Sequence, residues 1–157
     1  MSKFRQLVVF RLDERRYALS LQVVERIVRA TEVTPLPGAP AIVLGVINVG
    51  GRVLPVLNTR DRCRLPQREI SPADQFLIAQ TGNRTVVLII DQGEEVIELP
   101  TTQIVDVAQI APGLEQIHGV MKLSDGLVLI HDLDKFLSLE EERALDAAIN
   151  GEAGHGA

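Results

Sequence analysis

Apolar and polar residues alternate in short blocks along most of the chain, and this pattern predicts strands rather than helices. An apolar run at 7–10 is followed by a charged turn at 13–16, and apolar side chains then recur at every second position from Tyr17 to Leu21. A period of two is the spacing of a strand with one buried face. β-Branched residues are frequent in 23–28, which favours a further strand over its second half.

Two glycines separate two apolar runs, and this is the clearest local signal in the sequence. The runs cover 43–49 and 53–57, with Gly50 and Gly51 between them. Tight hairpin turns need positive φ, which glycine adopts at no steric cost, so a β-hairpin is predicted here. Pro55 cannot donate a hydrogen bond to a neighbouring strand, so an edge or a bulge is expected at its position.

The same β texture returns after a polar connector at 66–72. Two further hairpins are predicted around turns at 81–84 and 124–126, and another strand around 96–99. One helical turn is expected within 59–65, directly before the connector. The connector itself is the expected boundary between two halves of the chain.

The carboxy-terminal segment has the one convincing helical pattern. Ser138 followed by Glu141 is a capping box, in which each side chain accepts a hydrogen bond from the other residue's backbone N–H. Apolar residues follow at helical spacing within 145–149, and Gly151 is the expected stop. We expect residues 151–157 to be a disordered tail.

Composition narrows the function classes. The 157 residues have a net charge of −5, only 3% aromatic residues and one cysteine. An acidic chain with few aromatic rings is poorly suited to nucleic acid, because it repels phosphates and offers few stacking platforms. The single cysteine excludes an intramolecular disulfide and fits a reducing compartment. No apolar run approaches the ~20 residues of a membrane span, so we expect a cytoplasmic protein with no direct membrane insertion.

No group of residues has the pattern of a catalytic site. Cys63 has no histidine near it in the sequence, and the basic stretch 60–68 is interrupted by acidic residues, which favours an ion-paired connector. His131, Asp132 and Asp134 resemble a ligand cluster, but neighbouring residues of a strand point to opposite faces and aspartates are common in turns. We expect no catalytic residue, no metal site and no cofactor. The alternative is a small metal-binding or enzymatic β-barrel built on this trio.

The segment 37–60 shows a family resemblance. Its sequence is PGAPAIVLGVINVGGRVLPVLNTR. It resembles the signature of the CheW-like domain family of chemotaxis coupling proteins: a proline, a G-V-[IT]-N-L-R-G hairpin, and then V-[IL]-P-V-[VI]-[DN]-L. The segments 24–27 and 127–133 agree with the family in order, and the resemblance spans roughly residues 4–149.

The resemblance implies a mainly β fold. It consists of two small five-stranded, β-barrel-like (SH3-like) subdomains that share a hydrophobic core, with a carboxy-terminal α-helix. The whole chain, 1–157, is then a single domain. Its expected parts are subdomain 1 at 15–65, subdomain 2 at 75–133, and a strand at 5–12 and a helix at 138–150 that pack on them.

The resemblance also implies a function without catalysis. The family bridges the cytoplasmic tip of a methyl-accepting chemotaxis receptor and the regulatory domain of a CheA-type histidine kinase. A receptor helix can bury an apolar stripe in a groove between the subdomains. Matched residue by residue, the groove is expected to include Val24, Ile27, Gly45, Val53 and Leu99. The signature hairpin is represented by Asn48, Gly50, Gly51 and Pro55.

Two positions depart from the family pattern. Gly50 stands where the hairpin arginine is usual, and Arg26 stands where many members have an acidic residue. In those members the two groups can form an ion bridge on the receptor side, and here that bridge is expected to be absent. The extra glycine also makes the turn more flexible. These departures point towards a sister chemosensory pathway, such as pilus motility, as a setting for the chain.

Overall fold

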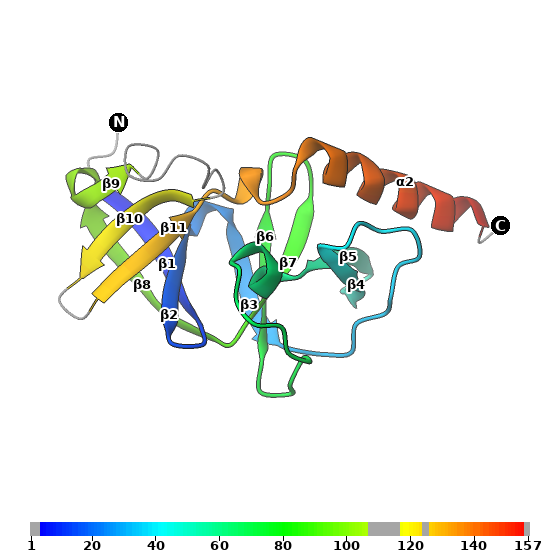
Figure 1. The fold of residues 1–157 in the computed structure, drawn as a ribbon, viewed down its shortest axis with the longest axis horizontal. Helices are drawn as coiled ribbons and strands as arrows, with labels where there is room; N and C mark the ends of the chain where they lie inside the picture. The colour runs from blue at the N-terminus through cyan, green and yellow to red at the C-terminus, as the bar shows by residue number, and fades with distance from the viewer. Residues whose placement is uncertain (1–3, 107–116, 124–125, 156–157) are drawn as a thin grey trace.

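Figure 1 shows the computed structural model, which describes residues 4–106, 117–123 and 126–155. Two sheets lie side by side along the long axis, and a helix runs above the second sheet. Sheet A has the strand order β8 (Gln92–Pro100), β1 (Phe4–Leu12), β2 (Arg15–Ser20), β11 (Gly126–His131), β10 (Ile117–Leu123) and β9 (Ile104–Asp106). Sheet B has the order β3 (Val24–Arg29), β6 (Gln75–Gln80), β7 (Thr85–Ile90), β5 (Arg52–Leu57) and β4 (Val43–Val49).

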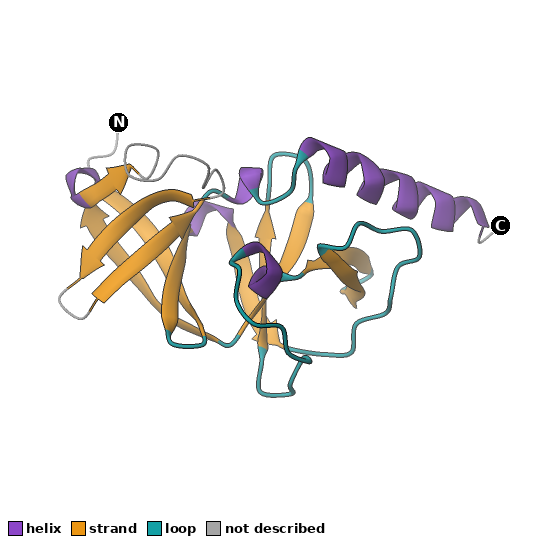
Figure 2. Ribbon diagram, viewed as in Figure 1, coloured by secondary structure: helices purple, strands orange, loops and turns teal. Residues whose placement is uncertain are grey.

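The described helices are short apart from the last one. They are η1 (Leu21–Val23), α1 (Thr59–Arg62), η2 (Thr101–Gln103), η4 (Leu133–Lys135) and α2 (Leu139–His155). Figure 2 shows how strands dominate both halves of the molecule, with α2 at one end. Within the described part of the chain, no helix is long and apolar enough to cross a membrane.

Three apolar clusters hold the fold together. One lies within sheet A and includes Leu7, Val9, Ala18, Leu99, Met121, Val128 and Ile130. A second lies within sheet B and includes Ile47, Leu54, Val56, Phe76, Ile78 and Val87. The third joins the two sheets, η4 and α2, and includes Phe10, Tyr17, Leu19, Leu77, Leu88, Phe136 and Leu145.

Strand β6 shows how one run of apolar residues serves two of these clusters. Phe76 and Ile78 belong to the inner cluster of sheet B, whereas Leu77 and Ala79 belong to the cluster between the sheets. This follows because successive side chains of a strand point to opposite faces.

The predicted fold class is confirmed: mainly β, two curled sheets and a shared core, with six strands rather than five in sheet A.

The two sheets divide the chain at different points from the subdomain bounds expected at 15–65 and 75–133. Sheet B contains every strand from β3 to β7, so the connector at 66–72 joins two strands of the same sheet. Strand β1 is a full member of sheet A, between β8 and β2. The cause is long-range pairing. Strands β11 and β2 pair in parallel, with Leu129 opposite Tyr17, and β5 pairs in parallel with β7. A local pattern does not reveal partners so far apart in the sequence.

The start of α2 is built as predicted. The backbone N–H of Ser138 donates to Glu141 Oε1 at 2.8 Å, and the N–H of Glu141 donates to Ser138 Oγ at 3.1 Å. Arg62 of α1 donates to the same Glu141 carboxylate at 2.6 Å, and Arg84 forms ion pairs with Glu142 and Asp146. These pairs fasten α2 to sheet B.

The end of α2 differs from the prediction. The helix was expected to stop at Gly151, and it continues to His155. A glycine lowers helix propensity by about 1 kcal/mol but keeps its backbone N–H, so it does not by itself end a helix. Of the expected tail, 156–157 lie outside the described residues.

Candidate functional site

Two of the expected groove residues lie together where the sheets meet. Val24 and Ile27 are on β3, the edge strand of sheet B, and both are half-buried against the shared cluster. Gly93, at the start of β8, lies against Ile27: a Cβ there would come within 2.6 Å of Ile27 Cδ1. Ile27 is therefore covered on one side by sheet A and partly open on the other.

Gly45 and Val53 belong to the signature hairpin, with different environments. Gly45 is buried on β4, and a Cβ at this position would lie 2.2 Å from the backbone oxygen of Thr34. The close approach of the 34 backbone leaves no room for a side chain. Val53 on β5 is 63% exposed, so it presents an open apolar surface on sheet B.

Leu99 does not join this set. It is 5% exposed and belongs to the inner cluster of sheet A, opposite Arg5 on β1. The structure therefore brings Val24 and Ile27 together, places Val53 on an exposed strand, and encloses Leu99 in a different core. Leu99 contributes to the packing of sheet A at this position.

The turn of the signature hairpin is tight and well ordered by its own side chains. Gly50 and Gly51 have φ of +58° and +87°, and the Gly51 N–H donates to Asn48 Oδ1 at 2.9 Å. Pro55 is buried on β5 opposite Val46. The irregularity expected near Pro55 occurs on the facing strand, where the register shifts between Val43 and Gly45.

An ion pair that the sequence analysis did not predict joins this hairpin to β3. Arg52 donates to both carboxylate oxygens of Glu25, at 3.2 and 2.8 Å. Neither Gly50 nor Arg26 takes part. Arg52 lies two residues after Gly50, and Glu25 immediately precedes Arg26. The ion pair therefore links the same two segments through different residues.

A second charged group fastens the two sheets, and the sequence analysis identified its arginines but not their acidic partners. Arg60 of α1 is nearly buried and donates to Asp13 at 2.8 Å and to Asp91 at 2.9 Å. Asp13 lies in the β1–β2 turn of sheet A, and Asp91 is the residue at which the chain passes from β7 to β8. The hydrogen bond from Arg60 holds the pKa of Asp13 below its ordinary value.

Arg68 extends this group into the connector. Its guanidinium donates to Asp74 at 2.7 Å and to Asp91 at 2.7 Å. Burial works to raise the pKa of Asp74, but hydrogen bonds from Arg68 and from the Ser71 N–H lower it overall. The expected ion-paired connector at 60–68 is thus confirmed. Its acidic partners were not identifiable, because they come from turns distant in the sequence.

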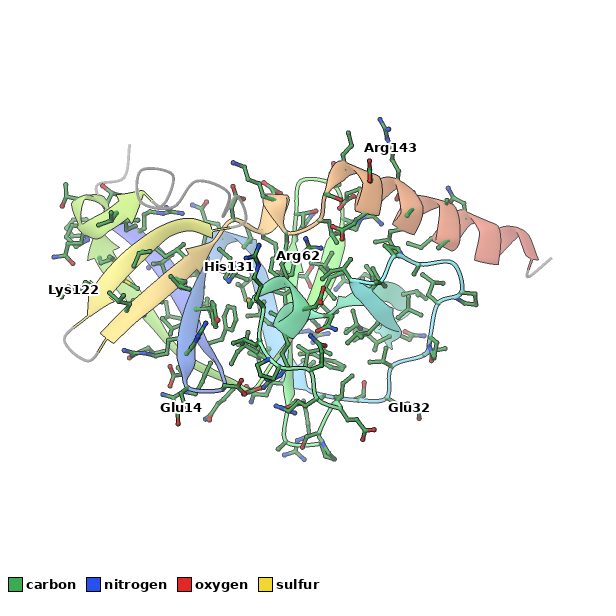
Figure 3. All side chains as sticks on the ribbon, in the orientation of Figure 1. Glu14, Glu32, Arg62, Lys122, His131 and Arg143 are labelled. Carbon is green, nitrogen blue, oxygen red and sulfur yellow. The ribbon has the colours of Figure 1, made fainter. Side chains whose placement is uncertain are left out.

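The trio behind the alternative function is occupied with structural contacts. Asp132 Oδ1 accepts from the N–H of Asp134 at 3.1 Å, and Asp134 Oδ1 accepts from the N–H of Gly82 at 2.7 Å. His131 is 4% exposed, and its ring lies 5.2 Å from the Tyr17 ring in a tilted arrangement. Figure 3 shows His131 near the middle of the molecule. Among the residues that the structure describes, no group of three or more His, Cys, Asp or Glu side chains converges to hold a metal.

Cys63 packs beside this histidine, with Sγ 3.5 Å from His131 Nε2. Burial raises the pKa of the thiol to about 12, and a nearby hydrogen bond with Tyr17 only partly offsets this. The thiolate is the nucleophilic form of cysteine. Cys63 therefore remains protonated near neutral pH and acts as a small apolar side chain.

Comparisons with known proteins agree with this architecture. The sequence profile of the CheW-like domain matches residues 6–141, from the first strand to the start of α2. A chemotaxis protein CheW of Treponema pallidum is 30% identical over 146 residues, covering 89% of this chain and 86% of that protein. A chemotaxis protein CheW of Rhizobium meliloti is 30% identical over 142 residues, covering 89% and 92%.

A solved structure gives the same result in three dimensions. The crystal structure of the scaffolding protein TtCheW from Thermoanaerobacter tengcongensis superimposes with a TM-score of 0.79 at 25% identity, covering 87% of this chain and 94% of that one. This chain and the solved relative therefore share the same mainly β architecture. The chain belongs to the CheW-like domain family.

Proposed function

We propose that this chain is a non-catalytic cytoplasmic adaptor that couples the tip of a chemoreceptor to the regulatory domain of a CheA-type histidine kinase. The observation that carries the proposal is the extent of the family match, which takes in strands of both sheets and the start of α2. Relatives that align over nearly their whole length are named chemotaxis proteins, and the solved relative is named a scaffolding protein.

The chemistry at the junction of the sheets supports a binding role. Val24 and Ile27 are aliphatic and half-buried, and Val53 is exposed on the neighbouring hairpin. Aliphatic side chains of this kind suit the apolar stripe of a receptor helix, which is recognised by burial of surface rather than by proton transfer. A contact of this type needs no titratable group.

An adaptor must also present separate surfaces to its two partners. Figure 1 shows the β10–β11 hairpin at one end of the long axis and the β4–β5 hairpin in the other half of the molecule. Val53 on β5 and Leu127 on β11 are exposed to similar extents, 63% and 60%. Apolar positions on two different sheets can contact different proteins at the same time.

The test is a binding titration against a chemoreceptor tip and, separately, a kinase regulatory domain from the same genome. Val53→Asp is expected to weaken receptor binding by about tenfold, because an apolar interface residue at the centre of a contact contributes more than 1 kcal/mol. Leu127→Asp is the matched control, since it places the same charge at an equally exposed site of sheet A. Unchanged receptor affinity for Val53→Asp would mean that the receptor does not contact the signature hairpin. Binding of the chain to neither protein would refute the adaptor role.

A further inference from the structure

A hollow of about 460 Å³ opens on sheet B, away from the junction with sheet A. It is formed by residues 30–33, which follow β3, and by 69–72, which precede β6. The labelled Glu32 in Figure 3 marks its position at the lower edge of the molecule. Neither stretch belongs to the groove or to the hairpin discussed above.

The hollow has an apolar floor and an acidic rim. Ala30, Val33 and Ile70 are half-buried and continue the inner cluster of sheet B. Glu32 and Glu69 stand exposed on the two sides. In the described part of the chain neither carboxylate forms an ion pair, and no lining residue is basic. Arg68, the neighbour of Glu69, is engaged by Asp74 and Asp91.

Hydrogen bonds within the chain fix the backbone of both stretches that line the hollow. The N–H of Ala30 donates to the carbonyl of Asp74 at 3.0 Å, and the N–H of Ser71 donates to the Asp74 carboxylate at 2.8 Å. Thr34 and Val46 exchange two backbone hydrogen bonds at 2.9 and 2.8 Å, which anchors the other end of the first wall. A preformed site lowers the ordering cost of binding.

We propose that this hollow docks a segment of a partner protein in which an aliphatic side chain stands beside lysine or arginine. The aliphatic group covers Val33 and Ile70, and the cations approach Glu32 and Glu69. The net charge of −5 attracts such a segment over a longer range and repels anionic ligands. The site is lined by residues other than Val24, Ile27 and Val53 of the proposed receptor surface, and its test requires neither receptor nor kinase.

The test uses the full chain and a capped Lys-Leu-Lys peptide as the probe, followed through backbone amide chemical shifts. Saturable shifts confined to 30–33 and 69–71 are expected, with a Kd on the order of millimolar for so small a ligand. Glu32→Gln combined with Glu69→Gln should weaken binding by about three- to tenfold, since two exposed charge pairs are lost. The control is Glu14→Gln combined with Glu95→Gln, which removes the same charge elsewhere: both residues are exposed, and Figure 3 places Glu14 far from Glu32.

Each of the following results would overturn the proposal. Non-saturable or dispersed shifts would mean that the hollow does not bind the probe. Binding of a Glu-Leu-Glu peptide as tightly as Lys-Leu-Lys would mean that the acidic rim does not contribute to recognition. Unchanged affinity in the variant with Glu32→Gln and Glu69→Gln would mean the same. Equal binding of Lys-Ser-Lys would remove the apolar floor. Shifts at 30–33 that follow protein concentration without peptide would assign the hollow to a second copy of the chain.

Discussion

Arg52 and Glu25 form a two-pronged ion pair, at 3.2 and 2.8 Å, that ties the turn of the β4–β5 hairpin to the edge strand β3. Along the chain, Glu25 follows Val24 and Arg52 precedes Val53, two of the residues expected to contact a receptor. Because Arg52 donates directly to the carboxylate, the pKa of Glu25 is lowered from its ordinary value. Both side chains are partly exposed, so the pair positions the hairpin rather than stabilising the whole fold.

Charge reversal tests this positioning role. Glu25→Arg and Arg52→Glu each place like charges together and should lower receptor-tip affinity by about threefold or more, while the free energy of unfolding changes by less than about 1 kcal/mol. The double variant Glu25→Arg with Arg52→Glu restores the pair in reverse and should recover most of the affinity. A double variant that binds no better than either single one would show that the pair does not set the geometry of the hairpin.

The sequence was sufficient for the local elements of the fold. The glycine pair at 50–51 gave the hairpin, the turn at 81–84 gave β6 and β7, and the capping box gave the start of α2. Each of these depends on neighbouring residues and on backbone preferences that the sequence displays directly. The two hairpins and the start of α2 therefore lie at the residues where the sequence pattern predicts them.

The division into sheets and the charged contacts were beyond the sequence. Which strands share a sheet depends on the parallel pairs β2–β11 and β5–β7, whose members lie far apart along the chain. Arg60 meets Asp13 and Asp91 only after both turns have been brought together. Arg52 likewise meets Glu25 through a closure of sheet B that no local spacing encodes.

The close backbone approach at Gly45 gives a stability prediction. Gly45→Ala places a Cβ 2.2 Å from the carbonyl oxygen of Thr34, so it should lower the free energy of unfolding by about 2–3 kcal/mol. Gly50→Ala is the matched control: nothing lies within 4 Å of its Cβ, and only the positive φ is unfavourable, which costs about 1 kcal/mol. Urea unfolding of both variants measures the difference. Equal losses of unfolding free energy in the two variants would mean that the backbone at Thr34 shifts to make room for the new methyl group.

The charged group around Arg60 gives a pH prediction. The pKa values of Asp13 and Asp74 are lowered in the folded protein, so their ionised forms stabilise it above the ordinary carboxyl pKa of about 4. This stabilisation is lost as the pH falls below that value, through the folded pKa of each group. Arg60→Gln should lower the free energy of unfolding by about 2–3 kcal/mol at pH 7.

The difference between the native chain and the Arg60→Gln variant should shrink as the pH falls from 5 towards 2, because Asp13, a partner of Arg60, becomes protonated in both. Urea unfolding at several pH values, with Arg11→Gln as a control for a more exposed arginine, gives the comparison. A difference that stays constant across this range would show that Arg60 acts through packing rather than through its charge.

The buried environment of Cys63 predicts slow alkylation of its thiol in the folded protein. With a pKa of about 12, fewer than about one thiol in a thousand is ionised at pH 8. Iodoacetamide should therefore label native Cys63 far more slowly than the urea-unfolded chain, at a rate that follows opening of the structure. Labelling of the native protein at the rate of a free thiol would contradict the burial that the structure shows.

The central claim is that one chain joins two partners, and simultaneous binding tests it most directly. A receptor tip is titrated into the chain alone and into the chain saturated with a kinase regulatory domain, and the affinity and the mass of the complex are measured. We expect a ternary complex with a receptor affinity within about threefold of that of the chain alone, because the two binding surfaces do not overlap. Displacement of the kinase domain by the receptor tip would contradict it, because competing partners cannot be coupled by one copy of this chain.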